Sequence, residues 1–517
     1  MKPRALQFFP AVMVIFCLAS CGGKSESSGG GNGSGGGKDL VIALDVAPTN
    51  LDSRVGNDLS SAKLFDLIYT PLIRFGNNGG YEPDLATSWD TPDDKTIVFH
   101  IRPGVKFHDG RPVTAKDVKF TYDSLMAESF QTAKKSGYAA LASIEVPDEK
   151  TVIFHFKEPN AGIFDNLNVG IVPQGADTNV FKTRPIGSGP YRVTNFLQDD
   201  RVEMEAYPGY YGGTPKIQHV IARVIPDATT RVLELKKGSV NFVMNSIPFD
   251  TVNQLKNDKN FTILRGPGST YGYLCFNLKD PVLQRKEVRQ AIAHAIDRGK
   301  IVDNLILGYG KVTNSLFPPG HWARAENLPD FNYDPANAKK MLDAAGFPDP
   351  DGAGSRSRFK LNYRTSTDAE SNQQAEIIQQ MLKQVGVDLE IQSNEFAVFY
   401  DDIQKGKFQL FSLRRAGVSD PDFYYTIFDS KSLPPDGQNR GYYINPKVDA
   451  LIEQGRSTFD KEKRKQAYVQ VQQILAEDLP YVSLYHRDNV AIMKSNVHGF
   501  EMGLRGYFPS VWKMTIN

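Results

Sequence analysis

The stretch FKLNYRTSTDAESNQQAEIIQQMLKQVGVDLEI, residues 359–391, shows most clearly how this chain alternates between strand and helix. Its apolar pattern predicts a strand over residues 359–363, a helix over residues 374–385 that ends at Gly386, and a second strand over residues 387–391. Two strands joined through a helix at this spacing favour a parallel pair with a right-handed crossover. The stretch therefore predicts an α/β fold.

The same alternation continues toward the N-terminus. Apolar runs over residues 39–45, 97–102 and 151–157 predict further strands. Thr114 and Asp117 have the spacing of a capping box, in which the side chain three positions into a helix bonds back to the capping residue. We therefore expect a helix to begin just after Thr114.

Toward the C-terminus, helices become more frequent. Apolar residues at helical spacing predict one helix over residues 288–307, which the following glycine would end. Asp334 and Pro335 are typical of an N-cap followed by the first turn of another helix. A helix over residues 461–477 and a strand over residues 481–485 come later.

The first twenty residues have the pattern of a secretory signal peptide. Lys2 and Arg4 give it a positive start, and residues 5–19 are uncharged, mostly apolar and too few to span a bilayer comfortably. The sequence LASC at residues 18–21 resembles a bacterial lipobox, which implies cleavage before Cys21 and a lipid on its thiol. The alternative is an ordinary secretory signal, residues 1–20, followed by an incidental cysteine.

The predicted signal peptide is followed by a Gly/Ser-rich segment. Thirteen of the seventeen residues 22–38 are Gly or Ser, which predicts a flexible coil. Together with Cys21 this segment would form a lipid-anchored linker over residues 21–38.

Charge and cysteine content exclude several classes of protein. The 60 Lys and Arg residues nearly balance the 59 Asp and Glu residues, so the chain lacks the basic character that a nucleic-acid partner requires. Cys17 would leave with the signal peptide and Cys21 would carry the lipid, so Cys275 remains alone and we expect no intramolecular disulfide. No apolar run long enough to span a membrane follows the signal peptide.

Catalytic and metal-binding motifs are not recognisable in the sequence. None of the eight histidines belongs to an HExxH motif, and no GxSxG motif occurs. His100 and His155 lie in predicted strands, where we expect them to be hydrogen-bonded, and Cys275 lies in strand-like sequence that would bury it. We predict no catalytic residue, no metal and no cofactor, and a protein that binds its ligand in a cleft between domains.

Several longer motifs resemble one family. The run EPDLATSW at residues 82–89 and the run from residue 94 to residue 118, which includes RPGVKFHDG and TAKDV, resemble the signature of family 5 extracellular solute-binding proteins. These proteins are the dipeptide- and oligopeptide-type receptors of ABC importers. Further similar segments follow in the family's order: PIGSGPY at 185–191, RQAIAHAIDR at 289–298, YDP at 333–335, AAG at 344–346 and NPKVDALI at 445–452.

The resemblance implies a type II periplasmic-binding-protein fold in its enlarged three-domain form, with two lobes joined by a hinge. Domain I would comprise residues 39–75, 185–266 and 486–517. Domain II would comprise residues 76–184, and domain III residues 267–485.

The resemblance also implies a ligand-binding segment. In peptide-binding relatives a segment similar to RAGW, followed closely by an aspartate, lies in the cleft, and the aspartate binds the peptide's α-ammonium. Residues 414–424 here read RRAGVSDPDFY, with Val418 in place of the tryptophan. Asp420 and Asp422 are therefore candidates for ligand binding. The alternative is that both belong to a capped turn that leads into a helix over residues 423–428.

Other residues are candidates by charge or by family position. Arg414 or Arg415 could bind a ligand carboxylate, and because neighbouring residues of a strand point to opposite faces, only one should face the cleft. We favour Arg415, which belongs to the RAG match. The remaining candidates, each with packing or capping as its alternative role, are Tyr273, Asn277, Leu51 and Asp52.

The predicted function is that of a monomeric, lipid-anchored substrate-binding protein that delivers short peptides to the permease and ATPase of an ABC importer. It would lie in the periplasm or at the outer face of the cell membrane. Two alternatives remain open: a receptor of the same family for a nickel complex, heme, oligosaccharide or opine, and a surface lipoprotein hydrolase. A third, an adhesin or sensor partner, would follow if the operon lacked a permease.

Overall fold

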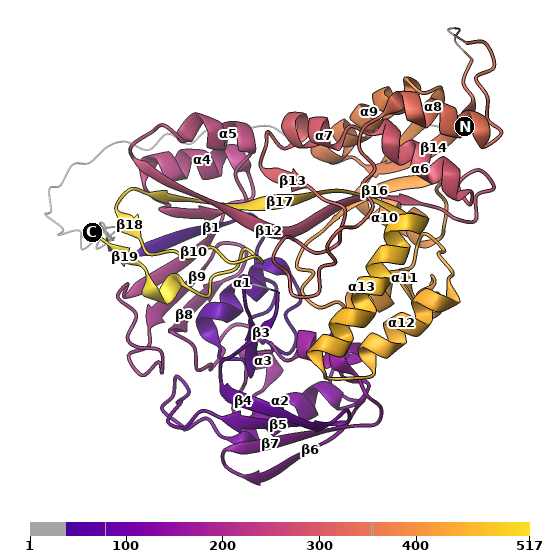
Figure 1. Ribbon diagram of the computed structural model, residues 1–517. Helices are drawn as coiled ribbons and strands as arrows, with labels where there is room; N and C mark the ends of the chain where they lie inside the picture. The colour runs from indigo at the N-terminus through magenta and orange to yellow at the C-terminus, as the bar shows by residue number, and fades with distance from the viewer. Residues whose placement is uncertain (1–37, 78, 353, 355) are drawn as a thin grey trace, which may run out of the picture. The chain divides into compact units, whose positions relative to one another are not determined.

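The computed structural model describes residues 38–77, 79–352, 354 and 356–517, which belong to one compact unit (Figure 1). The predicted signal peptide at residues 1–20, the lipidation of Cys21 and nearly all of the predicted linker lie outside the described residues.

The largest sheet contains eleven strands. Ten of them follow one another across the sheet in the order β15 (Val387–Asn394), β14 (Phe359–Ser366), β16 (Leu410–Arg415), β12 (Phe261–Phe276), β17 (Tyr481–Lys494), β11 (Phe242–Met244), β1 (Leu40–Leu44), β10 (His219–Val224), β9 (Arg201–Ala206) and β8 (Tyr191–Leu197). The eleventh, β13 (Gly310–Val312), pairs with β17. β14 and β15 are parallel and flank helix α9 (Ala369–Lys383), which confirms the predicted strand–helix–strand unit.

Two long strands lie next to each other in the middle of this sheet. β12 has 16 residues and β17 has 14, and they pair with each other along most of their length. The register between them shifts in two places, where residues 267–269 of β12 bulge out and again between Gly272 and Tyr273. The predicted domain boundaries after residues 266 and 485 both fall within these two strands.

The region predicted as one helix over residues 288–307 forms two. Helix α6 (Lys286–Ala295) ends where Ile296 adopts an extended conformation, and helix α7 (Arg298–Leu305) begins directly afterwards. The carboxylate of Asp297 caps α7 by accepting the backbone N–H of Lys300 at 3.0 Å. The prediction of a continuous helix was wrong because both helices pack their apolar residues into the same core, so the periodicity hides the cap between them.

A smaller antiparallel sheet forms a separate core. Its strands lie in the order β4 (Ala86–Asp93), β5 (Thr96–Ile101), β7 (Thr151–Phe156) and β6 (Leu141–Asp148), and helix α2 (Ala115–Met126) packs on β6 and β7 (Figure 1). Alternate residues of β5 and β7 are buried. His100 and His155 lie in these strands and contact the carboxylates of Asp90 and Glu145, which confirms their predicted role.

Helix α2 begins where the capping box was predicted. The carboxylate of Asp117 accepts the backbone N–H and the hydroxyl of Thr114, both at 2.9 Å. Its other oxygen accepts the backbone N–H of Gln174 at 3.0 Å. The box therefore fixes the start of α2 against a neighbouring loop.

Loss of the cap should have a moderate cost. Replacing Thr114 with alanine is expected to lower the free energy of unfolding by about 1 kcal/mol, because the start of the helix loses part of its cap. Urea unfolding followed by circular dichroism would measure the change. Lys116→Ala, at an exposed position of the same helix, is the control and should leave the midpoint nearly unchanged. Equal effects of both substitutions would contradict the role of the cap.

The remaining elements surround the two sheets. The helices are α1 (Leu59–Ile68), α3 (Thr178–Phe181), α4 (Ala228–Lys237), α5 (Phe249–Leu255), α8 (Pro335–Ala344), α10 (Phe396–Gln404), α11 (Phe423–Phe428), α12 (Pro446–Arg456) and α13 (Lys461–Asp478). Short paired strands are β2 (Ile73–Phe75) with β3 (Tyr81–Pro83), and β18 (Val497–His498) with β19 (Thr515–Ile516). The predicted N-cap is confirmed at α8, where Asp334 accepts the N–H of Asn337 at 2.9 Å. Helices α12 and α13 pack side by side (Figure 1).

Candidate ligand-binding cleft

A cleft of about 680 Å³ lies among segments that are far apart in the sequence. This volume lies within the range of about 300–1,000 Å³ that is usual for small-molecule sites. The lining residues come mainly from the start of α1, the turn after β2, the end of the 3₁₀ helix Ala161–Asn166, the loops before α5 and after β16, the middle of β17, and residues 503–507. The cleft is therefore built from non-local contacts.

Two lysines contribute positive charge to the cleft. Lys63, on α1, is buried, and burial lowers its pKa while the nearby Asp45 carboxylate opposes this shift. Lys134 donates its ammonium to the backbone carbonyl of Ser53 at 2.6 Å and lies over the ring of Phe65. Partial burial lowers the pKa of Lys134 to about 8.

Two of the aspartates that line the same cleft have raised pKa values. Asp66, on α1, accepts the backbone N–H of Phe508 at 2.9 Å, and burial raises its pKa to about 7. Asp165 accepts a hydrogen bond from the hydroxyl of Ser419 at 3.1 Å. Burial, followed by repulsion from the Asp420 carboxylate, raises the pKa of Asp165. Arg505 opposes the upward shift of both carboxyls.

The segment predicted to bind ligand reaches the cleft only in part. Ala416 and Gly417 line the cleft, whereas Arg414 and Arg415 do not appear among its lining residues. Gly417 adopts a φ of +76°, a conformation that a side chain would strain. Of the three residues that match RAG, only Ala416 and Gly417, in the turn after β16, therefore reach the cleft.

Arg414 and Arg415 point to opposite sides of β16, as predicted for neighbouring strand residues. Arg414 pairs with Glu370 at 2.7 Å and with Asp368 at 3.1 Å, beside a second cavity of about 270 Å³. Arg415 donates to the side chain of Gln438 at 2.6 Å and lies over the ring of Phe423. Ligand binding by either arginine stays a prediction.

Asp420 is buried and engaged by protein groups. One of its oxygens pairs with Arg464 at 2.7 Å and accepts the backbone N–H of Asp422 at 2.8 Å. The other oxygen accepts the hydroxyl of Tyr81 at 2.8 Å. These contacts match the alternative of a capped turn, and helix α11 begins at Phe423 as that alternative predicted.

Asp422 is also paired within the protein. Its carboxylate lies 2.7 Å from the guanidinium of Arg456. Burial raises the pKa of Asp422 to about 6, although Arg456 opposes the shift. In this structure Asp420 and Asp422 thus tie α11 to α12 and α13, and their role as ligand acceptors stays a prediction.

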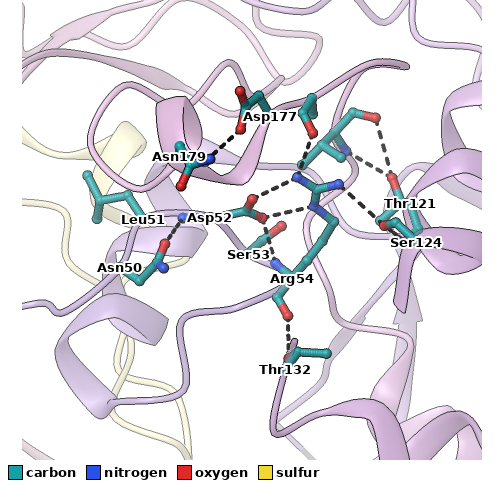
Figure 2. A network of polar contacts seen from close by, with 12 residues as sticks. Asn50, Leu51, Asp52, Ser53, Arg54, Thr121, Ser124, Thr132, Asp177 and Asn179 are labelled. Carbon is teal, nitrogen blue, oxygen red and sulfur yellow. Dashed lines mark hydrogen bonds and ion pairs between the residues drawn. The ribbon is translucent and has the colours of Figure 1, made fainter. Parts of the chain in front are cut away.

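The four candidates chosen by family position are all buried and lie outside the cleft lining. Leu51 and Tyr273 pack in two separate cores, and Tyr273 stacks on Tyr481 with 4.7 Å between ring centroids. The side-chain amide of Asn277 donates to two backbone carbonyls, at 2.8 and 3.3 Å. Asp52 pairs with Arg54 at 2.7 Å (Figure 2). Ligand contacts of these four residues stay predictions.

Sequence patterns missed the charged residues that do line the cleft. Lys63 and Asp66 lie on α1 but belong to no recognised motif. Lys134, Asp165 and Arg505 come from three other segments of the chain. For the pair on α1, the spacing of three positions was the one available signal, because it places both on one helix face.

Metal sites, reactive thiols and membrane-spanning helices characterise other functional classes. Within the described residues, no cluster of three or more His, Cys, Asp or Glu side chains has the geometry to hold a metal ion. Cys275 is buried, and burial raises the pKa of its thiol. In the same part of the chain, none of the helices combines the length and apolar character needed to cross a bilayer.

An α/β fold with a cleft of this size is typical of a protein that binds a small solute. Residues 80–433 match the middle region of the bacterial extracellular solute-binding proteins, family 5, and the chain belongs to this family. The oligopeptide-binding protein AppA of Bacillus subtilis (strain 168) is 29% identical over 97% of this chain and 96% of AppA. The dipeptide-binding protein of Escherichia coli (strain K12) is 26% identical over 90% of this chain and 92% of its own length.

Solved structures share the fold. The structure of AppA in complex with a nonapeptide aligns with 93% of this chain and 99% of AppA, with a TM-score of 0.74 and 27% identity. The structure of NikZ from Campylobacter jejuni in complex with Ni(L-His) aligns with 92% of this chain and 99% of NikZ, with a TM-score of 0.76 and 26% identity. These similarities confirm the predicted α/β fold of the periplasmic-binding-protein type.

Proposed function

We propose that the protein is a substrate-binding lipoprotein of an ABC importer that captures short peptides in the described cleft and delivers them to a membrane permease. The observation that carries the proposal is the similarity to peptide-binding proteins over nearly the whole chain, AppA among them. The lipid on Cys21 would hold the protein at the outer face of the membrane or in the periplasm. The partner ATPase would supply the energy for transport, and the protein itself would act as a monomer without catalysis.

The capture mechanism rests on the proposed three domains. Domains I, II and III would comprise the residues given above, with β12 and β17 as the connections between lobes. An extended peptide would pair with cleft-lining backbone, which gives affinity without strong sequence preference. A ligand that contacts both lobes stabilises the closed form. A ligand that binds the open and closed forms equally would not change the equilibrium between them.

A second candidate is a receptor for a non-peptide solute. NikZ, which is similar over most of this chain, was solved with Ni(L-His), and AgaA, at 25% identity and a TM-score of 0.72, was solved with agropinic acid. Val418 stands where the RAGW segment of peptide-binding relatives has tryptophan, and this difference supports a receptor for a non-peptide solute.

Native mass spectrometry of the full-length protein, extracted in detergent and purified without refolding, tests the proposal. We expect a series of added masses that resolve, after denaturation, into intact di- to pentapeptides. A protein stripped by unfolding and refolding, then mixed with the released fraction, should regain the same masses. Release of a single metal complex, opine or sugar would contradict the peptide assignment and support the receptor for a non-peptide solute. Cleavage of the peptides during incubation would support the surface hydrolase.

A further inference from the structure

Arg505 lies in the cleft where three distant segments meet. Its guanidinium carbon is 4.0 Å from the ring centroid of Phe75 and 4.6 Å from that of Tyr507. A Cβ built on Gly417, in the turn after β16, would lie 3.8 Å from a terminal guanidinium nitrogen. All four residues line the cleft. The two rings and the glycine backbone therefore hold the guanidinium in place at the cleft wall.

The hydrogen-bonding capacity of this guanidinium is largely unused. An arginine side chain has five N–H donors, and a buried donor without an acceptor is costly. The Nε of Arg505 is buried and has no hydrogen-bond partner among the described residues. One terminal nitrogen donates to the Tyr507 hydroxyl over 3.4 Å, which is long for such a bond. The site thus presents donors to which no protein acceptor is matched.

The nearest acidic groups do not form a direct ion pair with Arg505. Among the described residues, no carboxylate oxygen lies within 4.0 Å of its guanidinium nitrogens. Asp66 and Asp165 are close enough to interact with its charge, but each accepts a hydrogen bond from another group, the backbone N–H of Phe508 at 2.9 Å and the hydroxyl of Ser419 at 3.1 Å. A solute carboxylate that enters the cleft could form the direct ion pair that neither aspartate forms with Arg505.

We propose that Arg505 binds a carboxylate of the captured solute. For a peptide this group is the C-terminal carboxylate or an acidic side chain, and a guanidinium binds either with two parallel hydrogen bonds. The inference rests on the proposed function in that the cleft is taken as the solute site. It does not require a peptide, because a histidine complex of nickel and an opine acid also carry carboxylates. Oligosaccharides, which lack them, are disfavoured.

Calorimetry with the full-length protein, stripped of co-purified solute, tests this assignment. The probes are alanine peptides of two to five residues as free acids, the same peptides as C-terminal amides, and Ala-Asp-Ala amide. We expect the amides to bind about 10- to 100-fold more weakly than the acids, since hydrogen bonds to a charged group are lost. If Ala-Asp-Ala amide binds as tightly as the free acids, Arg505 binds an acidic side chain of the peptide and not its C-terminal carboxylate.

Variants distinguish ligand recognition from a structural role. Arg505→Gln should abolish the difference between acid and amide, whereas Arg505→Lys should retain part of it because the charge remains. A merely structural role would weaken acid and amide equally and leave their ratio unchanged, which would overturn the inference. This ratio stays informative even when a variant is less stable.

The panel also separates this inference from the peptide assignment. If the peptides fail to bind but the nickel–histidine complex or agropinic acid binds and loses affinity in Arg505→Gln, the peptide assignment falls and the role of Arg505 stands. If acids and amides bind the unmodified protein equally, the role of Arg505 falls and the peptide assignment stands. Binding of neutral oligosaccharides alone would overturn both.

Discussion

Replacement of Arg54 with methionine is expected to lower the free energy of unfolding by about 3–5 kcal/mol, because it leaves the Asp52 carboxylate buried without its partner. Both side chains are almost fully buried, with exposed fractions of 1% and 0%. The guanidinium donates to the two oxygens of Asp52 at 3.0 and 2.7 Å and to the carbonyl of Ala176 at 3.0 Å (Figure 2). Methionine fills much of the same volume but can replace none of these bonds.

A second Asp–Arg pair in the same chain is a matched control for this prediction. Arg111 pairs with Asp109 at 2.7 Å, with the same spacing of two residues, but its side chain is 54% exposed. Arg111→Met should therefore cost less than about 1 kcal/mol, as is usual for exposed ion pairs. Midpoints of urea unfolding, followed by tryptophan fluorescence and circular dichroism, would measure both variants. Similar shifts for the two variants would show that burial is not the source of the effect.

The second large effect is expected at Arg464. Its guanidinium pairs with the buried Asp420 at 2.7 Å and donates to the backbone carbonyl of Gly455 at 3.2 Å. Arg464→Met should lower the free energy of unfolding by about 3–5 kcal/mol, because the charge of Asp420 then lacks a buried counter-ion. Tyr81 still donates to that carboxylate, so part of the contact between β3 and the turn before α11 remains. The same unfolding experiment measures the loss.

A double substitution shows whether the uncompensated charge is responsible. Asp420→Asn combined with Arg464→Met should be more stable than Arg464→Met alone, because the buried charge is removed. Lys463→Met, at an exposed neighbouring position of α13, should leave the midpoint unchanged. If the double variant were no more stable than the single one, packing rather than charge would explain the loss.

Local sequence signals predicted those parts of the fold that depend on neighbouring residues. The strand–helix–strand unit around α9, the start of α2 at Thr114 and the cap of α8 at Asp334 follow from apolar periodicity and capping side chains, and all three are present. The helix predicted over residues 288–307 shows the limit of such signals. An aspartate within an amphipathic pattern can be an exposed helical residue or a cap, and only its tertiary setting decides.

The cleft was harder to predict because its charges come from residues far apart in the chain. The segment that contains the RAG match reaches the cleft at Ala416 and Gly417. The charged residues within that segment, however, face protein partners in this structure. Arg505 meets Phe75 from the opposite end of the sequence, and no periodicity or motif encodes such a meeting.

The paired strands β12 and β17 have a mechanical consequence. The hydrogen-bond ladder between them resists stretching and sliding of one strand along the other, because either movement would break it. The bulge at residues 267–269, where Pro267 has no N–H to contribute, interrupts that ladder, and a second irregularity lies between Gly272 and Tyr273. We therefore expect any bending of these two strands to concentrate at the two interruptions, while the continuous parts of the ladder keep their alignment.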